Sequence, residues 1–317
     1  MKKRLLLVLG LLLPALPAAA EELPRGPFRI VSGFAAGGSI DTLARFIARA
    51  AQDRTGRTFV VENRPGAGGT LGAASVARAA PSGETLLVSE LGTVATARAI
   101  FPNLPYDPEA DLAPVILAAT QPIVIVSGTG ATTLAGLLDR ARQAPGRVTH
   151  GATGVGNVTQ FLAAELARRG GVEFTDVHYR SGGEGTNALL RREVDFSFAS
   201  LATATPHIQS GALRALAVLE AARLPEWPEL PTAAETLPGL EASFWYGLHA
   251  PAATPPATIA ALNAAIGDAL RQEETRRALS AAGFRVAPGT SAEYGALVAR
   301  ERATWIPVIQ RLGLAVP

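Results

Sequence analysis

The sequence predicts an α/β protein of two lobes with a cleft between them. Short apolar runs alternate with segments of helical periodicity along most of the chain, which is the pattern of sheets with crossover helices. A long strand-like stretch at 113–127 separates a first alternating region from a second one of similar size. Glycine-rich turns recur where the apolar runs end, and such turns suit the start of a helix.

The first twenty residues have the organisation of a secretory signal peptide. Residues 2–4 are basic, an apolar run follows at 5–13, and a run of three alanines ends at Ala20, as signal peptides require. The apolar run is too short for a membrane span, which needs roughly 20 residues. We therefore expect export with cleavage near Ala20.

Composition excludes several classes of function. Lys2 and Lys3 are the only lysines and there is no cysteine, which excludes a lysine nucleophile, a lipid-anchored cysteine and disulfides. Three of the 29 Lys and Arg residues lie in the leader, so 26 basic residues remain against 27 acidic ones. This balance gives no support for nucleic-acid binding. We expect a soluble globular protein once the leader is removed.

The first lobe is predicted to begin with alternating strands and helices. Strands are expected at 28–34, 58–62 and 85–89, with helices at 41–54 and 70–79. In the first helix Leu43, Ile47 and Ala50 share one face, and Gly56 ends it. A strand at 244–250 and helices at 256–271 and 291–312 have no sheet of their own, so they are expected to return to this lobe. Its predicted bounds are 21–120 and 243–317.

The second lobe is predicted over 121–242. Strands are expected at 148–151, 176–179, 194–199 and 213–218, and helices at 134–143, 159–169 and 184–192. The proline-rich segment at 225–239 is predicted to be an extended loop. Because the chain crosses between the lobes twice, we expect a cleft that closes on a small ligand by hinge motion.

Four turns after strands are candidates for lining this cleft, since ligands of open α/β sheets sit at the carboxyl ends of strands. They lie at 37–39, 89–93, 154–157 and 180–183 and are rich in Gly, Ser, Thr and Asn. Such turns supply neutral hydrogen-bond donors and helix N-termini, which suit a carboxylate better than proton transfer. For any single turn, N-capping alone is the alternative explanation.

Groups for catalysis are sparse. The histidines at 150, 178, 207 and 249 show no i, i+4 pairing, and cysteine is absent, so the usual zinc-site spacing does not occur. Neither a G-x-S-x-G elbow nor a P-loop occurs, which removes two common catalytic arrangements. We therefore predict a protein that is not an enzyme, without metal or cofactor.

An NAD-type dinucleotide-binding oxidoreductase is the alternative. The motif Gly151-x-x-Gly154-x-Gly156 follows a predicted strand and precedes a helix. Asp176 lies near the position of a ribose-binding acid. However, the third glycine of the fingerprint would fall on Thr159, and an exported enzyme would rarely meet NAD.

Several motifs follow one another between Ile30 and the C-terminus. They are FAAGGSID, VVENRPGAGG, AAPSGETLLV, LPYDPEADLAPV, VDFSFAS, PHIQSGALRALAV and LPTAAETLPGLEASFWYGLHAP. With these motifs the chain resembles solute receptors of the Bug type, the periplasmic binding components of tripartite tricarboxylate transporters. The resemblance implies a two-lobed type II periplasmic-binding-protein fold, a periplasmic location and a monomer. It also implies a ligand with one or more carboxylates, such as a di- or tricarboxylate, amino acid or aromatic acid. Membrane transporter subunits or a sensor would be the partners.

The resemblance further implies which residues hold the ligand. They are Phe34, Ala36, Gly37, Gly38, Ser39 and Asp41 in the first loop, Ser89 and Thr93 in another, Gly154, Gly156, Asn157 and Thr159 in the second lobe, and Tyr179, Arg180 and Asp195 in a fourth region. Glu90 departs from the family pattern, and Trp245 and Tyr246 fit an aromatic pair near the hinge. The turn at 65–69 is expected to be structural and to mark the family.

Overall fold

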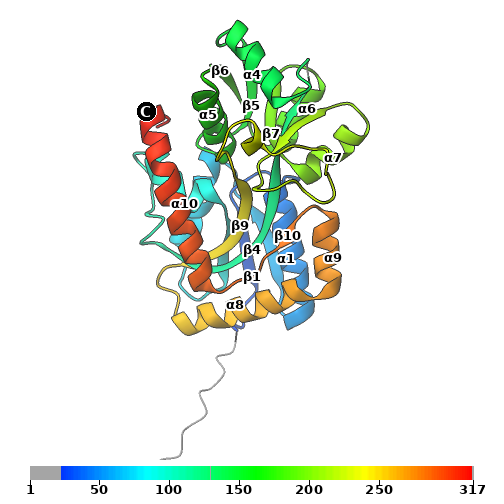
Figure 1. Cartoon of the computed structure of the whole chain (residues 1–317). Helices are drawn as coiled ribbons and strands as arrows, with labels where there is room; N and C mark the ends of the chain where they lie inside the picture. Colours follow the sequence, from blue (N-terminus) through cyan, green and yellow to red (C-terminus); the bar gives the residue numbers. More distant parts are fainter. Residues whose placement is uncertain (1–22, 129, 316–317) are drawn as a thin grey trace, which may run out of the picture.

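The strand β4 (Leu112–Ser127) runs through both halves of the computed structural model, which describes residues 23–128 and 130–315 (Figure 1). Residues 112–122 of β4 pair with β9 (Ser243–Pro251), whereas residues 123–127 pair with the strands of the other half. Pro122 therefore stands where the strand changes partners. The predicted signal peptide lies outside the described residues.

The first lobe contains the N-terminal and C-terminal parts of the described chain. Its strands are β1 (Phe28–Ser32), β2 (Phe59–Asn63), β3 (Thr85–Ser89), β9 and β10 (Arg285–Val286). Its helical elements are α1 (Ser39–Thr55), η1 (Ala67–Gly69), α2 (Thr70–Ala77), η2 (Gly92–Thr96), α3 (Ala97–Ile100), α8 (Pro256–Arg271), α9 (Glu273–Ala281) and α10 (Ser291–Leu312). β1 runs parallel to β2 and β3, and β9 lies antiparallel between β3 and β4.

The second lobe is built from the middle of the chain. Its strands are β5 (Val148–Thr153), β6 (Phe174–Tyr179), β7 (Phe196–Ser200) and β8 (Arg214–Val218). Its helices are α4 (Leu134–Gln143), α5 (Val158–Gly170), α6 (Gly182–Leu190), α7 (Leu201–Gln209) and η3 (Ala233–Glu235). β5 is parallel to β6 and β7, while β4 is antiparallel to β7 and β8. The α/β class predicted from the sequence is confirmed.

Strand pairing links the two lobes into one path of order β2-β1-β3-β9-β4-β7-β5-β6. Ile123, Val124, Ile125 and Val126 of β4 have no exposed surface, so the crossing strand is also part of the second lobe's core. This change of partners near residue 122 supports the proposed division into 21–120 with 243–317 and 121–242.

The structure differs from the predicted elements in two ways. It adds α3, α7, α9 and β10; α3 and β10 have four and two residues, which are too few to show a periodicity. α10 also does not belong to the first lobe alone. The Trp305 ring lies 6.0 Å from that of Phe161 on α5, and Arg311 lies 3.9 Å from Glu165. This helix therefore packs on both lobes, with α5 beside its C-terminal half (Figure 1).

Candidate functional site

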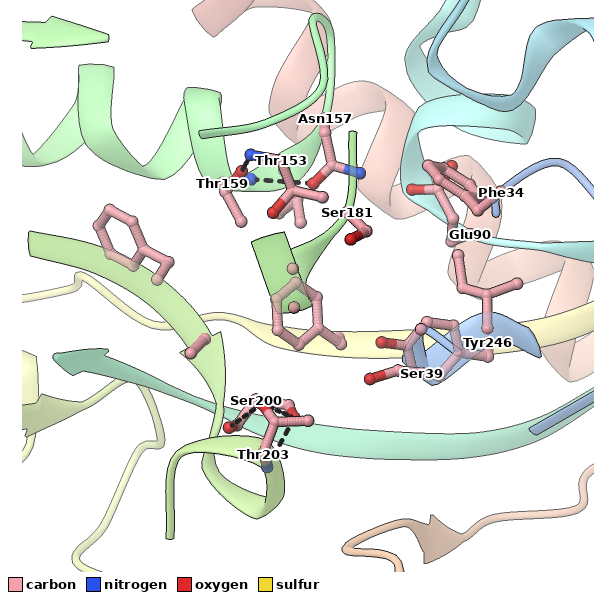
Figure 2. Close-up of a pocket in the computed structure, with 18 of the residues that line it drawn as sticks. Phe34, Ser39, Glu90, Thr153, Asn157, Thr159, Ser181, Ser200, Thr203 and Tyr246 are labelled. Atoms are coloured by element: carbon pink, nitrogen blue, oxygen red, sulfur yellow. Dashed lines mark hydrogen bonds between the residues drawn. The ribbon is translucent and has the colours of Figure 1, made fainter. Parts of the chain in front are cut away.

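A cavity lies between the lobes, with walls from both of them (Figure 2). Its volume is about 140 Å³, where one water molecule needs roughly 10–15 Å³, so it has room for a small organic molecule. The first lobe supplies Phe34, Ala35, Gly37, Gly38, Ser39, Ile40, Glu90, Phe244 and Tyr246, and the second lobe supplies Thr153, Asn157, Val158, Thr159, Ser181, Gly182, Gly183, Phe198, Ala199, Ser200 and Thr203.

On the first lobe, the N-terminus of α1 meets the cavity. The N-cap of this helix is Gly38, which has no side chain to cap the first turn. Gly37 has φ of +88°, a left-handed conformation that glycine adopts without strain. The loop before α1 can therefore present its backbone to the cavity at close range.

Buried Asp41 holds this loop in place. Its Oδ2 accepts hydrogen bonds from the backbone N–H of Gly37 and from Nε of Arg45, both at 3.0 Å. Its Oδ1 accepts a bond of 3.0 Å from Nδ2 of Asn63, which also donates to the carbonyl of Phe34 at 3.0 Å. Burial alone would raise the pKa of Asp41, but these hydrogen bonds outweigh it and hold the pKa below its usual value.

On the second lobe, three helices begin at the cavity, and each has a side-chain cap. Asn157 accepts from Thr159 N at the start of α5, Ser181 from Glu184 N at α6, and Ser200 from Thr203 N at α7. All three caps follow the C-terminal ends of strands in one sheet, which is where α/β proteins place ligands.

The positive ends of four helix dipoles therefore meet in one cavity. Each N-terminus is equivalent to roughly half a positive charge, and its unpaired N–H groups suit an anion. Lys, Arg and His are absent among the described residues that line the cavity. The arrangement can bind an anion through backbone groups and hydroxyls, without a salt bridge.

Glu90 is the single acidic residue in the described lining. Its side chain is nearly buried, and its two carboxylate oxygens accept from Gly92 N at 2.7 Å and Thr93 N at 2.9 Å. Burial raises the pKa of the Glu90 carboxyl to about 7, against the lowering effect of those two bonds and of a hydrogen bond from the Thr93 side chain. Figure 2 shows Glu90 beside Phe34, across the cavity from Asn157 and Ser181.

The structure brings six of the predicted ligand contacts into the cavity wall. They are Phe34, Gly37, Gly38, Ser39, Asn157 and Thr159. Of the other predicted residues, Asp41 acts on the first loop from behind. Ala36 and Gly156 lie in turns that do line the cavity, but neither residue is itself among the lining residues. Their role as ligand contacts stays a prediction.

Ser89 and Thr93 are buried behind the wall. The hydroxyl of Ser89 lies 2.8 Å from both Nδ1 of His249 and the hydroxyl of Tyr294. Thr93 Oγ1 donates to the carbonyl of Glu90 at 3.1 Å, and Thr93 O accepts from Tyr106 at 2.7 Å. Both therefore support the loop that presents Glu90.

Asp195 lies before β7, at the end of that strand opposite the cavity residue Ser200. It bonds to the backbone N–H of Thr149 at 2.9 Å and to Nη2 of Arg140 at 2.9 Å. These contacts tie β5, β7 and α4 together. Here the geometry indicates a structural role, and a ligand contact is not supported.

A second, wider groove shares Phe34 and Ala35 with the cavity. It is lined by Gly33, Phe34, Ala35, Pro65, Gly66, Ala67, Gly68, Gly69, Phe101, Gly154, Val155, His178, Tyr179, Arg180 and Glu184. The predicted contacts Gly154, Tyr179 and Arg180 therefore face this groove. Arg180 is paired with Glu184 at 2.8 Å and is largely exposed.

The turn at 65–69 lies against the second lobe. A Cβ atom at Gly68 would come within 2.9 Å of the carbonyl oxygen of Val155, so the two lobes touch at this backbone. Asn63, which belongs to the same VVENRPGAGG motif, holds the first loop by its hydrogen bonds to Phe34 and Asp41. The motif thus supports the cavity wall as well as the contact between the lobes.

The dinucleotide alternative finds no support in the geometry. Asp176, the proposed ribose partner, is 2.8 Å from Nδ1 of His150 on the neighbouring strand. Gly154 lines the second groove and is not among the residues that line the cavity at the start of α5.

Several lining residues were outside the predicted set. Ser200 and Thr203 were missed because Pro206 interrupts the periodicity of α7. The available signal was Ser200, which ends an apolar strand and could be predicted to cap a helix that begins there. Ser181, Gly182 and Gly183 lay in a turn singled out for the cleft, but the predicted contacts there stopped at Arg180.

In the described part of the chain, no group of three or more His, Asp or Glu residues could hold a metal ion. None of the described helices is long and apolar enough to cross a membrane.

Known proteins resemble this chain over nearly its full length. The model of the tripartite tricarboxylate transporter family receptor matches residues 43–314. Protein BugT of Bordetella pertussis is 32% identical over 318 residues, which cover 98% of each chain.

Solved structures agree with the fold. The structure of Rpa4515 from R. palustris with adipate has a TM-score of 0.87 and 30% identity, covering 93% of this chain and 99% of that one. MatC (Rpa3494) from Rhodopseudomonas palustris with bound malate has a TM-score of 0.84 and 33% identity, covering 90% of this chain and all of that one.

Proposed function

The chain belongs to the tripartite tricarboxylate transporter receptor family and is a periplasmic solute-binding receptor, not an enzyme, and we propose that it captures a small carboxylate in the cavity between its lobes. The observation that carries this proposal is the meeting of four helix N-termini in one cavity. A carboxylate is small, planar and negative, so it can accept bonds from several such termini at once.

The dimensions of the site support a ligand of a few carbon atoms. The cavity is enclosed by Phe34 and Phe244 on one lobe and Phe198 on the other, which suits a short apolar chain between polar ends. Rpa4515 was solved with adipate and MatC with malate, and ligands of both kinds fit this description.

The two lobes are proposed to close on the ligand by hinge motion at the crossing strands, as a monomer. The signal peptide at 1–20 would deliver the protein to the periplasm. There we propose that it hands its ligand to the membrane subunits of a tripartite transporter. The test is uptake of the labelled ligand by cells lacking this gene. Undiminished uptake together with loss of a ligand-dependent transcriptional response would assign the protein to a sensor instead.

Calorimetry on the purified mature protein tests the carboxylate ligand. The panel is malate, adipate, citrate, aspartate, 6-aminohexanoate and benzoate, with glucose as a neutral control. We expect saturable binding of at least one acid, accompanied by an increase in Tm that grows with ligand concentration. Absence of binding by every acid would overturn the carboxylate proposal.

A further inference from the structure

The charges around the cavity are distributed unevenly between the lobes. The second lobe presents three helix N-termini, and none of its described lining residues is acidic. The first lobe presents one helix N-terminus and the carboxyl group of Glu90. A ligand that is anionic at both ends would place one carboxylate near a buried acid, which disfavours both ionised forms.

Glu90 retains unused acceptor capacity. Its oxygens accept backbone hydrogen bonds from Gly92 N and Thr93 N, and the Thr93 side chain also bonds to the carboxyl, whereas a carboxylate offers about four lone-pair sites. The side chain is 5% exposed, and it forms part of the cavity wall. A protonated amine in the cavity could donate to it and would supply the missing positive charge.

We propose that Glu90 selects a zwitterionic ligand, in which a carboxylate lies at the helix N-termini of the second lobe and a protonated amine binds Glu90. This inference rests on the proposed function and narrows the ligand to an amino acid or another amine-bearing acid. The observation that leads to this inference is that the Glu90 carboxyl lines the cavity, while no cationic side chain is present in the described lining.

The other ionisable groups around Glu90 stay in one state between pH 6 and 8. Burial raises the pKa of Tyr106, Tyr246 and Tyr294 above the usual value, so they remain neutral. Burial lowers the pKa of His249 to about 3, and it is also neutral. Two charged side chains complete the surroundings: Asp41 on α1, whose pKa is held below its usual value, and Arg302 on α10, which pairs with Glu109. A proton exchanged near pH 7 on binding would therefore report on Glu90.

Matched ligand pairs test the selection. Malate and aspartate differ by a hydroxyl against an ammonium group, and adipate and 6-aminohexanoate differ by a carboxylate against an ammonium group at similar length. At pH 8, where Glu90 is ionised, we expect the amine member of at least one pair to bind wild-type protein at least 10-fold more tightly. In Glu90→Gln this ratio should fall at least 10-fold. Tighter binding of the partner without the amine in both pairs, or an unchanged ratio in the variant, would overturn the inference.

Glu90→Gln could lower stability, because its side chain cannot accept from both Gly92 and Thr93. Proton linkage in the wild-type protein provides a measurement without a variant. Calorimetry at pH 7 in buffers of different ionisation enthalpy should show proton release when aspartate or 6-aminohexanoate binds, since an ammonium group lowers the pKa of Glu90. Proton uptake, or no exchange, would overturn the inference.

The two proposals fail in different ways. Binding of malate, adipate or citrate with a preference over the amine-bearing acids overturns the zwitterion inference and leaves the carboxylate receptor intact. Binding of no acid in the panel overturns both.

Discussion

Both walls of the cavity present helix N-termini, but different residues support these termini in the two lobes. In the second lobe α5, α6 and α7 begin at consecutive strand ends, and each is capped by its own Asn or Ser side chain. In the first lobe only α1 begins at the cavity, its N-cap is Gly38, and its loop is held by Asp41 from behind. The second wall is therefore rich in neutral donors, whereas the first combines a glycine-rich backbone with two buried acids, Asp41 and Glu90.

This difference indicates that the two lobes bind different parts of the ligand. Three aligned helix termini make the second lobe the stronger anion site, since each adds a partial positive charge. The first lobe contributes Phe34, Phe244 and Tyr246, so it supplies most of the aromatic surface. Four substitutions test this comparison.

The largest expected effect comes from Ser181→Asp in the second lobe. Aspartate keeps the N-cap of α6 but places a negative charge at the proposed carboxylate position. Two like charges about 5 Å apart interact by about 3 kcal/mol at an effective dielectric constant of 20, so we expect a loss of roughly 100-fold in affinity by calorimetry. Ser181→Asn is the control, because it caps the helix without charge. Equal affinities of the two variants would place the carboxylate elsewhere.

Asp41→Asn tests the support of the first loop. The amide cannot accept from Gly37, Arg45 and Asn63 together, and hydrogen bonds to a charged group contribute about 2 kcal/mol. We expect the free energy of unfolding at pH 7 to fall by about that amount in urea titrations. Because the folded pKa of Asp41 is lowered, its contribution is present above the unfolded pKa and is lost as pH falls through the folded pKa.

The pH series supplies the control for Asp41. The stabilities of wild type and variant should converge as pH falls below the folded pKa of Asp41 and differ most above pH 5. A difference that stays constant over this range would show that the charge of Asp41 does not support the loop.

Ser39→Asp is the matched change in the first lobe. The added acid stabilises the start of α1, so folding should be preserved. Because the single terminus of α1 is the weaker anion site, we expect about a 10-fold loss of affinity, less than for Ser181→Asp. The reverse ranking of the two variants would mean that the first lobe holds the carboxylate.

The smallest expected effect on affinity comes from a substitution where the two lobes are in contact. At Gly156 a Cβ atom would lie 2.6 Å from Cγ2 of Ile100 on α3 of the other lobe, whereas at Gly154 nothing lies within 4 Å. Both residues have positive φ, so alanine causes similar backbone strain at each. We expect Gly156→Ala to weaken binding about 5-fold relative to Gly154→Ala, by resisting closure. Equal affinities would argue against the contact.

Much of the fold could be predicted because it is encoded locally. The alternation of apolar runs and helical patterns predicts β1, α1, β2 and β3 to within a few residues. The two-lobed fold is confirmed by the solved relatives. α7 escaped detection because Pro206 breaks its pattern, although the helix accommodates the proline near its end.

The candidate site was predictable only in part. Asn157 and Ser39 begin helices at glycine-rich turns, and this signal is visible in the sequence. Whether Ser89 or Ser200 reaches the cavity is not, since both end strands and only Ser200 lies in the wall. Ser89 is covered by His249 and Tyr294, residues 160 and 205 positions away.

By itself, the sequence determined the α/β alternation, several of the helix starts, the absence of cysteine and the absence of lysine after residue 3, since each depends on neighbouring residues or on composition. Only the tertiary structure decided that the starts of α1, α5, α6 and α7 share one cavity with Glu90. That convergence depends on strand order, in which β4 and β9 bring distant segments together. Such pairings lie between residues more than a hundred positions apart, and local patterns do not encode them.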